Sequence, residues 1–77
     1  MENYQNQQEV PVPDGTRQIQ ARDLEIGNWV LSDPAAEHQD FLEITAVEDN
    51  GALVSITYRF RDHPVEYRPN QILFLRA

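Results

Sequence analysis

Arginine and aromatic residues in the middle and C-terminal parts of the chain have the side chains best suited to recognising another molecule. Arg59 and Arg61 are two residues apart, so on an extended strand both project from the same outer face. We expect Phe41 opposite Arg59, with Trp29 and Arg68 in neighbouring segments. Such residues are enriched at protein interfaces. The sequence therefore predicts a partner-binding surface formed by these five residues, with Arg76 in a further neighbouring segment.

Two other interpretations of these residues stay open. Arginine binds phosphate and aromatic rings stack on bases, so the same residue types also suit single-stranded nucleic acid. Alternatively, Phe41 and Trp29 cap the ends of a small barrel while the arginines pair with Glu43 and Glu66. The direction of Trp29 decides between a binding surface and a barrel cap. If Val30 points into the core, Trp29 points outward. If Trp29 points inward, the argument for an exposed tryptophan fails.

The charge of the chain is strongly acidic and unevenly distributed. The formal net charge is -7, from 13 acidic residues and 6 arginines, with no lysine. Residues 1–49 contain 11 of the acids and 2 of the arginines. This charge repels a polyanion and disfavours nucleic acid as a partner. It either keeps a small domain soluble or forms an acidic face that meets a basic partner or mimics nucleic acid.

The sequence contains no pattern typical of an enzyme, a cofactor site or a metal site. Its two histidines, His38 and His63, lie in predicted loops, where a solvated side chain is the simplest interpretation. Glu37 and Asp40 flank His38 without the regular spacing of a metal site. There is no cysteine, and the three glycines are isolated rather than grouped in a phosphate-binding loop. We therefore expect no catalytic residues, no cofactor and no metal.

The length and hydropathy of the chain predict one small soluble domain. Seventy-seven residues suffice for a single domain with a modest core, which self-association would help to stabilise. The first 20 residues lack the basic start and apolar run of a signal peptide, and no stretch approaches the roughly 20 apolar residues of a membrane span. We expect a cytoplasmic protein that does not bind membranes.

A long β-hairpin between residues 41 and 60 must position Phe41 and the arginines. Two runs rich in β-branched and aromatic residues flank the turn sequence Asp49-Asn50-Gly51. We favour a three-residue loop that pairs Glu48 with Ala52, with Gly51 in the left-handed conformation, over a two-residue turn. The favoured register places apolar pairs on one face: Ala46 with Val54, Ile44 with Ile56, and Leu42 with Tyr58.

Val47 and Leu53 depart from this alternation, because both are apolar on the polar face of the hairpin. Either the hairpin bends there and covers them, or they belong to a contact surface.

The rest of the chain is predicted as a tail followed by one β-domain. Residues 1–18 are rich in amide side chains and contain Pro11 and Pro13, so we expect a disordered tail. A less favoured interpretation is that residues 10–13 are an extended peptide ligand. Residues 19–77 form the domain, with short strands around residues 29–31, 65–67 and 71–75, and residues 17–20 are a candidate first strand at its boundary with the tail.

Two short motifs resemble a known family. Leu24-x-x-Gly27-Asn28-x-Val30 resembles the opening of Src-homology-3-like and KOW-like barrels, with asparagine where aspartate is usual. Pro69-Asn70-Gln71-Ile72 resembles the closing element of Src-homology-3 domains, one residue shorter and without its aromatic residue. The resemblance implies an all-β fold, a five-stranded Src-homology-3-like barrel. The acidic aromatic motif that grips proline-rich peptides is absent, so that activity does not carry over.

Our leading hypothesis is a non-enzymatic protein-interaction module, a small accessory or regulatory protein of phage or bacterial origin with an unidentified protein partner. The first alternative is a barrel that binds single-stranded nucleic acid. The second is a weakly self-associating structural barrel whose subunit contact involves Val47, Leu53 and the last strand.

Overall fold

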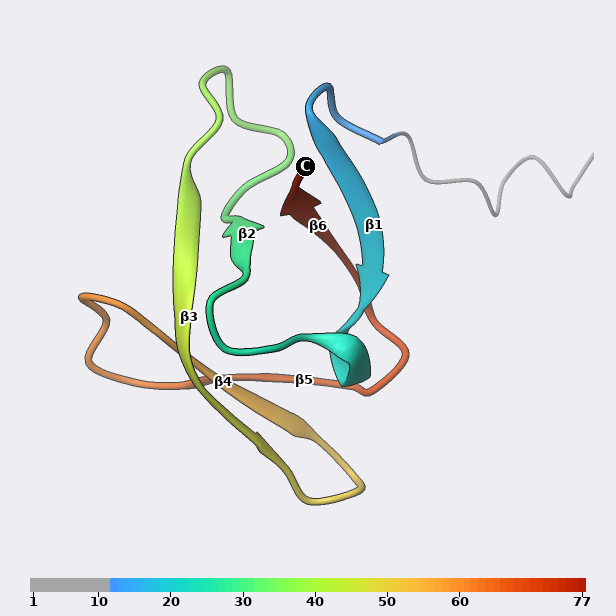
Figure 1. Cartoon of the computed structure of the whole chain (residues 1–77), viewed down its shortest axis with the longest axis vertical. Helices are drawn as coiled ribbons and strands as arrows, with labels where there is room; N and C mark the ends of the chain where they lie inside the picture. The colour runs from blue at the N-terminus through green and yellow to red at the C-terminus, as the bar shows by residue number, and fades with distance from the viewer. Residues whose placement is uncertain (1–11) are drawn as a thin grey trace, which may run out of the picture.

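Six antiparallel strands form one sheet in the computed structural model, which describes residues 12–77 (Figure 1). They are β1 (Thr16–Gln20), β2 (Trp29–Leu31), β3 (Phe41–Asp49), β4 (Val54–Tyr58), β5 (Val65–Tyr67) and β6 (Ile72–Arg76), with a short 3₁₀ turn, η2 (Ala21–Asp23), after β1. The order across the sheet is β1-β6-β2-β3-β4-β5. The described residues include no helix with the length and hydrophobicity that a membrane crossing requires.

The all-β class is confirmed, but the expected strand count of five is wrong. The strand beyond the five of the expected barrel is β1, which the sequence indicated around residues 17–20 and which pairs with β6 along its whole length, from Thr16 opposite Arg76 to Gln20 opposite Ile72. Residues 16–18, expected in the tail, therefore belong to the sheet, because β6 offers their backbone a hydrogen-bonding edge. Residues 1–11 of the expected tail lie outside the described residues. The sheet is open, since its order ends at β1 and β5.

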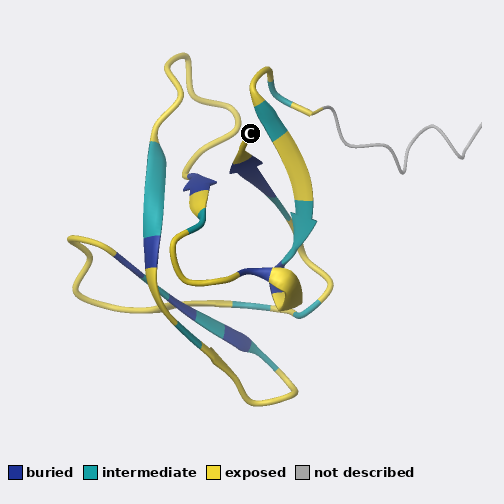
Figure 2. Cartoon of the chain, in the orientation of Figure 1, coloured by how far each residue is buried: buried dark blue, intermediate teal, exposed yellow. Residues whose placement is uncertain are grey.

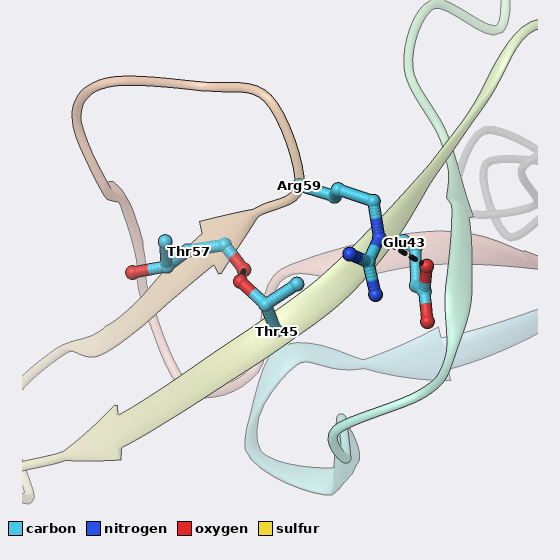
Figure 3. Close-up of polar contacts among 4 residues, drawn as sticks. All are labelled: Glu43, Thr45, Thr57 and Arg59. Atoms are coloured by element: carbon cyan, nitrogen blue, oxygen red, sulfur yellow. Dashed lines mark hydrogen bonds and ion pairs between the residues drawn. The ribbon is translucent and has the colours of Figure 1, made fainter.

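Strand β3 connects the two halves of the sheet. Its first residues pair with β2 and its later ones with β4, so β4 and β5 cross the half that contains β1, β6 and β2 (Figure 1). Between the halves, the pairing changes from Ile44 opposite Tyr58 to Ala46 opposite Thr57, which leaves Thr45 as an extra residue in a β-bulge. The Thr45 hydroxyl donates to the carbonyl oxygen of Thr57, 3.2 Å away (Figure 3).

The bulge corrects the predicted alternation along β3. Thr45 and Ala46 are both exposed, whereas Ile44 is buried and Val47 packs against the core. One extra residue moves every later side chain to the opposite face. Of the two interpretations of Val47, a bend that covers it is the correct one, and Leu53 is half-buried in the turn.

The predicted register of the hairpin is also wrong. Asp49 pairs with Val54, which makes a four-residue loop of residues 50–53 instead of pairing Glu48 with Ala52. Side chains stabilise this longer loop, because Asn50 Oδ1 accepts the backbone N–H groups of residues 52 and 53 at 3.0 and 2.9 Å. The left-handed conformation predicted for Gly51 is confirmed by its φ of 91°.

The core lies between the two halves of the sheet (Figure 2). Alternate residues of β4 are buried, and they pack with residues from β2, β3 and β6 and from the segment around η2. The buried members of this cluster are Ala21, Leu24, Val30, Ile44, Val54, Ile56, Tyr58 and Leu75. The core therefore depends on contacts between residues far apart in the sequence.

Candidate interaction surface

A tight turn of residues 25–28 positions Trp29 at the start of β2. The N–H of Asn28 donates to the Glu25 carbonyl oxygen at 3.1 Å, and Asn28 Oδ1 accepts the Glu25 N–H at 2.8 Å. Gly27 has a φ of 95° and donates its N–H to the Ile44 carbonyl oxygen at 2.9 Å. Asn28 thus supplies the side-chain acceptor that an aspartate would supply, so the departure from the barrel motif leaves the turn intact.

Trp29 points away from the core. Val30 is buried in the core cluster, whereas Trp29 remains 36% exposed, as alternation along a strand requires. Trp29 pairs with Glu43, and Leu31 pairs with Phe41. Of the two directions that the sequence left open for Trp29, the structure has the outward one, with Val30 inward. Phe41 faces Leu31 and not Arg59 as expected, because the pairing partner of its strand segment is β2.

An arginine from the last strand covers the two aromatic rings. The Arg76 guanidinium carbon lies 4.7 Å from the centroid of the Trp29 ring and 5.8 Å from that of Phe41. Both distances lie within the range of cation–π attraction. Within residues 12–77, Arg76 has no ion pair with a carboxylate. Its hydrogen-bond donors are therefore available to an acceptor on another molecule.

Glu43 connects this aromatic group to Arg59. The Arg59 Nε donates to Glu43 Oε1 at 2.6 Å (Figure 3). The Arg59 backbone N–H donates to the Glu43 carbonyl oxygen at 2.9 Å. The hydrogen bond from Arg59 is the main reason that the Glu43 carboxyl has a pKa below its ordinary value. We call the group formed by Trp29, Phe41, Glu43, Arg59 and Arg76 the Trp29 surface.

The other two predicted arginines, Arg61 and Arg68, both follow the end of β4. Strand β4 ends at Tyr58, so Arg59 and Arg61 do not share one face of an extended strand. Arg61 instead lines a groove beside β5. Arg68 lies in the turn after β5, where its carbonyl oxygen accepts the N–H of Gln71. Beyond the end of β4 the two arginines do not continue the strand face expected from the sequence, and the binding role of the five residues stays a prediction.

Phe60 is an exposed aromatic residue that the pattern of the hairpin did not identify. It has a φ of 66° and is 91% exposed, in the turn closed by the hydrogen bond from the Arg61 N–H to the Tyr58 carbonyl oxygen. A left-handed conformation is uncommon for a bulky residue. The alternation of residues 54–58 continues as far as Phe60, which hides the end of the strand from sequence inspection.

Within the described part of the chain, no group of three or more His, Cys, Asp or Glu residues is arranged to hold a metal ion. His38 and His63 are both exposed. The tyrosines Tyr58 and Tyr67 form a hydroxyl–hydroxyl hydrogen bond of 2.8 Å, and burial raises the pKa of Tyr58 well above its ordinary value. A phenol so difficult to ionise serves as a hydrogen-bonding group rather than as a base.

Comparison of the chain with protein-family models, curated proteins and solved structures gave no match.

Proposed function

We propose that the chain is a non-enzymatic protein-interaction module that binds an unidentified protein partner through the Trp29 surface. The observation that carries this proposal is the placement of the Arg76 guanidinium over the exposed ring of Trp29 and beside Phe41. Tryptophan and arginine dominate the energetic centres of protein interfaces, because they combine a large apolar area with directional hydrogen bonds. An exposed tryptophan held in one orientation also loses little entropy on binding.

The charges near the Trp29 surface favour a protein over nucleic acid. Arg59 is already paired with Glu43, so of the two arginines in this surface only Arg76 has no ion pair within residues 12–77. The net charge of -7 further opposes a polyanion. A partner with an apolar patch for Trp29 and a carbonyl or carboxylate acceptor for Arg76 fits this surface.

We also propose that the curled sheet is an open, six-stranded variant of the Src-homology-3-like barrel. Two observations support this relationship: the turn of residues 25–28 leads into β2 as the resemblance implies, and the bulged β3 is shared by both halves of the sheet. Fold alone does not assign a function, so this proposal is independent of the one above. The cytoplasmic location and the phage or bacterial origin stay predictions.

The binding proposal is tested with the full chain as bait and three variants. After a partner has been captured and identified, its affinity is measured for the wild type, Trp29→Ala, Arg59→Glu and the control Arg22→Glu. Arg22 is an exposed arginine on η2, so it matches the charge change outside the Trp29 surface. We expect Trp29→Ala to weaken binding at least tenfold, which corresponds to about 1.4 kcal/mol, and Arg22→Glu to leave it unchanged.

Two results would contradict the proposal. Full binding by Trp29→Ala, with the variant folded by circular dichroism, places the partner on another face. If instead a single-stranded oligonucleotide shifts the NMR signals of Trp29 and Arg76, with an affinity that falls steeply with salt, the nucleic-acid alternative replaces the protein one.

A further inference from the structure

A groove beside β5 has no lining residue in common with the Trp29 surface. It has a volume of about 460 Å³ and lies between β5, the end of β2 and the start of β6. Its apolar lining includes Leu31, Leu42, Val65, Tyr67, Ile72 and Phe74. Val65 and Ile72 are two of the exposed large hydrophobic residues, so the groove presents apolar side chains to solvent. We call it the β5 groove.

The charge of the β5 groove differs from that of the chain as a whole. The chain contains 13 acidic residues, yet no acidic residue lines the groove. Its basic residues are Arg61 and His63, both from the loop between β4 and β5. The groove is therefore complementary to a ligand that is mainly apolar and carries a negative charge at one end.

A pair of tyrosines adds an unused donor to the groove. Tyr58 and Tyr67 both line it, and their hydroxyl oxygens are 2.8 Å apart. Two hydroxyl groups have two protons, and one hydrogen bond between them uses one, so the second proton remains available. Neither tyrosine hydroxyl has another hydrogen bond within residues 12–77. A part-buried donor without a partner favours a ligand that brings an acceptor.

The β5 groove borders an unpaired strand edge. Strand β5 is the last in the sheet order, and no other described strand pairs with its outer edge. An extended peptide can pair with such an edge through its backbone while alternate side chains enter the neighbouring groove. A small organic acid would leave the backbone groups of this edge unused, so the edge favours a peptide.

We propose that the β5 groove binds an extended peptide segment of a partner protein as a seventh strand. Apolar side chains of the segment enter the groove, and an acidic side chain at its C-terminal end meets Arg61 and His63. The polarity follows from the fold: the loop containing both basic residues precedes β5, so it lies at the N-terminal end of that strand. A peptide added antiparallel to β5 brings its own C-terminal end to that position.

This inference does not rest on the Trp29 surface, because the two sites have no residue in common. A partner that loses affinity with Trp29→Ala but not with changes in the groove supports the first site alone, and the reverse result supports the second alone.

The test uses the full-length, ¹⁵N-labelled chain and the peptide acetyl-Val-Thr-Val-Thr-Glu-amide as the probe. Its first, third and fifth side chains share one face when extended, so two valines and the glutamate enter the groove. We expect the peptide to shift the amide signals of Val65, Glu66, Tyr67 and Ile72. A matched peptide ending in lysine should bind about fivefold more weakly, the range of a solvent-accessible charge pair.

A charge reversal in the protein provides the second arm of the test. Arg61→Glu should reverse the preference, so that the lysine peptide binds more tightly than the glutamate peptide. Arg17→Glu makes the same charge change on β1, outside the groove, and should retain the wild-type preference. A peptide methylated on its backbone nitrogens should lose binding, because it cannot donate hydrogen bonds to the edge of β5.

Four results would overturn the proposal. They are the absence of shifts on β5 at millimolar peptide, equal binding of the glutamate and lysine peptides, an unchanged preference in Arg61→Glu, and full binding of the methylated peptide. A fifth result would identify a second copy of this chain, instead of a peptide, as the ligand. This result is a shift of the same β5 amide signals when the protein concentration is raised without peptide.

Discussion

Phe60 allows a test of whether its left-handed backbone costs more free energy than the slight burial of its side chain returns. Its backbone has a φ of 66°, and the residue is 91% exposed. The conformation costs free energy that burial of the ring does not offset. We therefore predict that Phe60→Gly makes the protein more stable, although it removes an entire aromatic side chain.

The magnitude follows from two opposing terms. A left-handed conformation costs an L-residue about 1–2 kcal/mol, and Phe60→Gly removes that cost. Glycine loses about 0.5–1 kcal/mol more than other residues on folding, because its unfolded chain is freer. The difference between these terms spans about 0–1.5 kcal/mol. At its midpoint of about 0.75 kcal/mol, the melting temperature of a domain of this size rises by roughly 3–6 °C.

A substitution in the opposite direction, from glycine to alanine, measures the same free-energy cost of a left-handed backbone. Gly51 also has a positive φ, of 91°, and a Cβ added there would meet no atom within 4 Å. Gly51→Ala therefore introduces the left-handed cost without a steric clash, and we expect it to destabilise the protein by about 1 kcal/mol. Urea unfolding followed by far-UV circular dichroism measures both variants against the wild type.

A fall in the urea midpoint of Phe60→Gly would refute this reasoning, because it would mean that the ring makes stabilising contacts in solution. Repeating the measurement at two protein concentrations about tenfold apart identifies their origin. A loss that grows with concentration would place the ring in a contact between two copies of the chain.

Two further predictions concern the core and the ion pair. Ile56→Ala should lower the free energy of unfolding by about 2–5 kcal/mol, because Ile56 is fully buried, whereas Ile26→Ala at an exposed position should change it by less than about 0.5 kcal/mol in the same urea titrations. The hydrogen bond with Arg59 lowers the pKa of Glu43 in the folded state, so the stability that the ionised carboxylate adds is present above its unfolded pKa of about 4.3 and is lost as the pH falls through the lower folded value. The urea midpoints of wild type and Glu43→Gln should therefore differ at pH 7 and converge in acid. A difference that does not change with pH would contradict the role of this pair.

Local sequence patterns predicted several features of the fold correctly. The β-branched and aromatic runs indicated the all-β class and the strand at residues 29–31, and the turn sequence before Ala52 indicated the left-handed Gly51. The opposite directions of Trp29 and Val30 also followed from the sequence. Each depends on a preference of a residue or its immediate neighbours, so it can be recognised without knowledge of the fold.

The tertiary structure decided the features that involve distant residues. Alternation assumes an uninterrupted strand, so it missed the bulge at Thr45, which turns Val47 toward the core. It also missed the end of β4, which separates Arg61 from Arg59. Arg76 reaches Trp29 because β6 lies beside β2, across 47 residues of sequence. Pairing between strands depends on the burial of the whole core, and no local pattern contains that information.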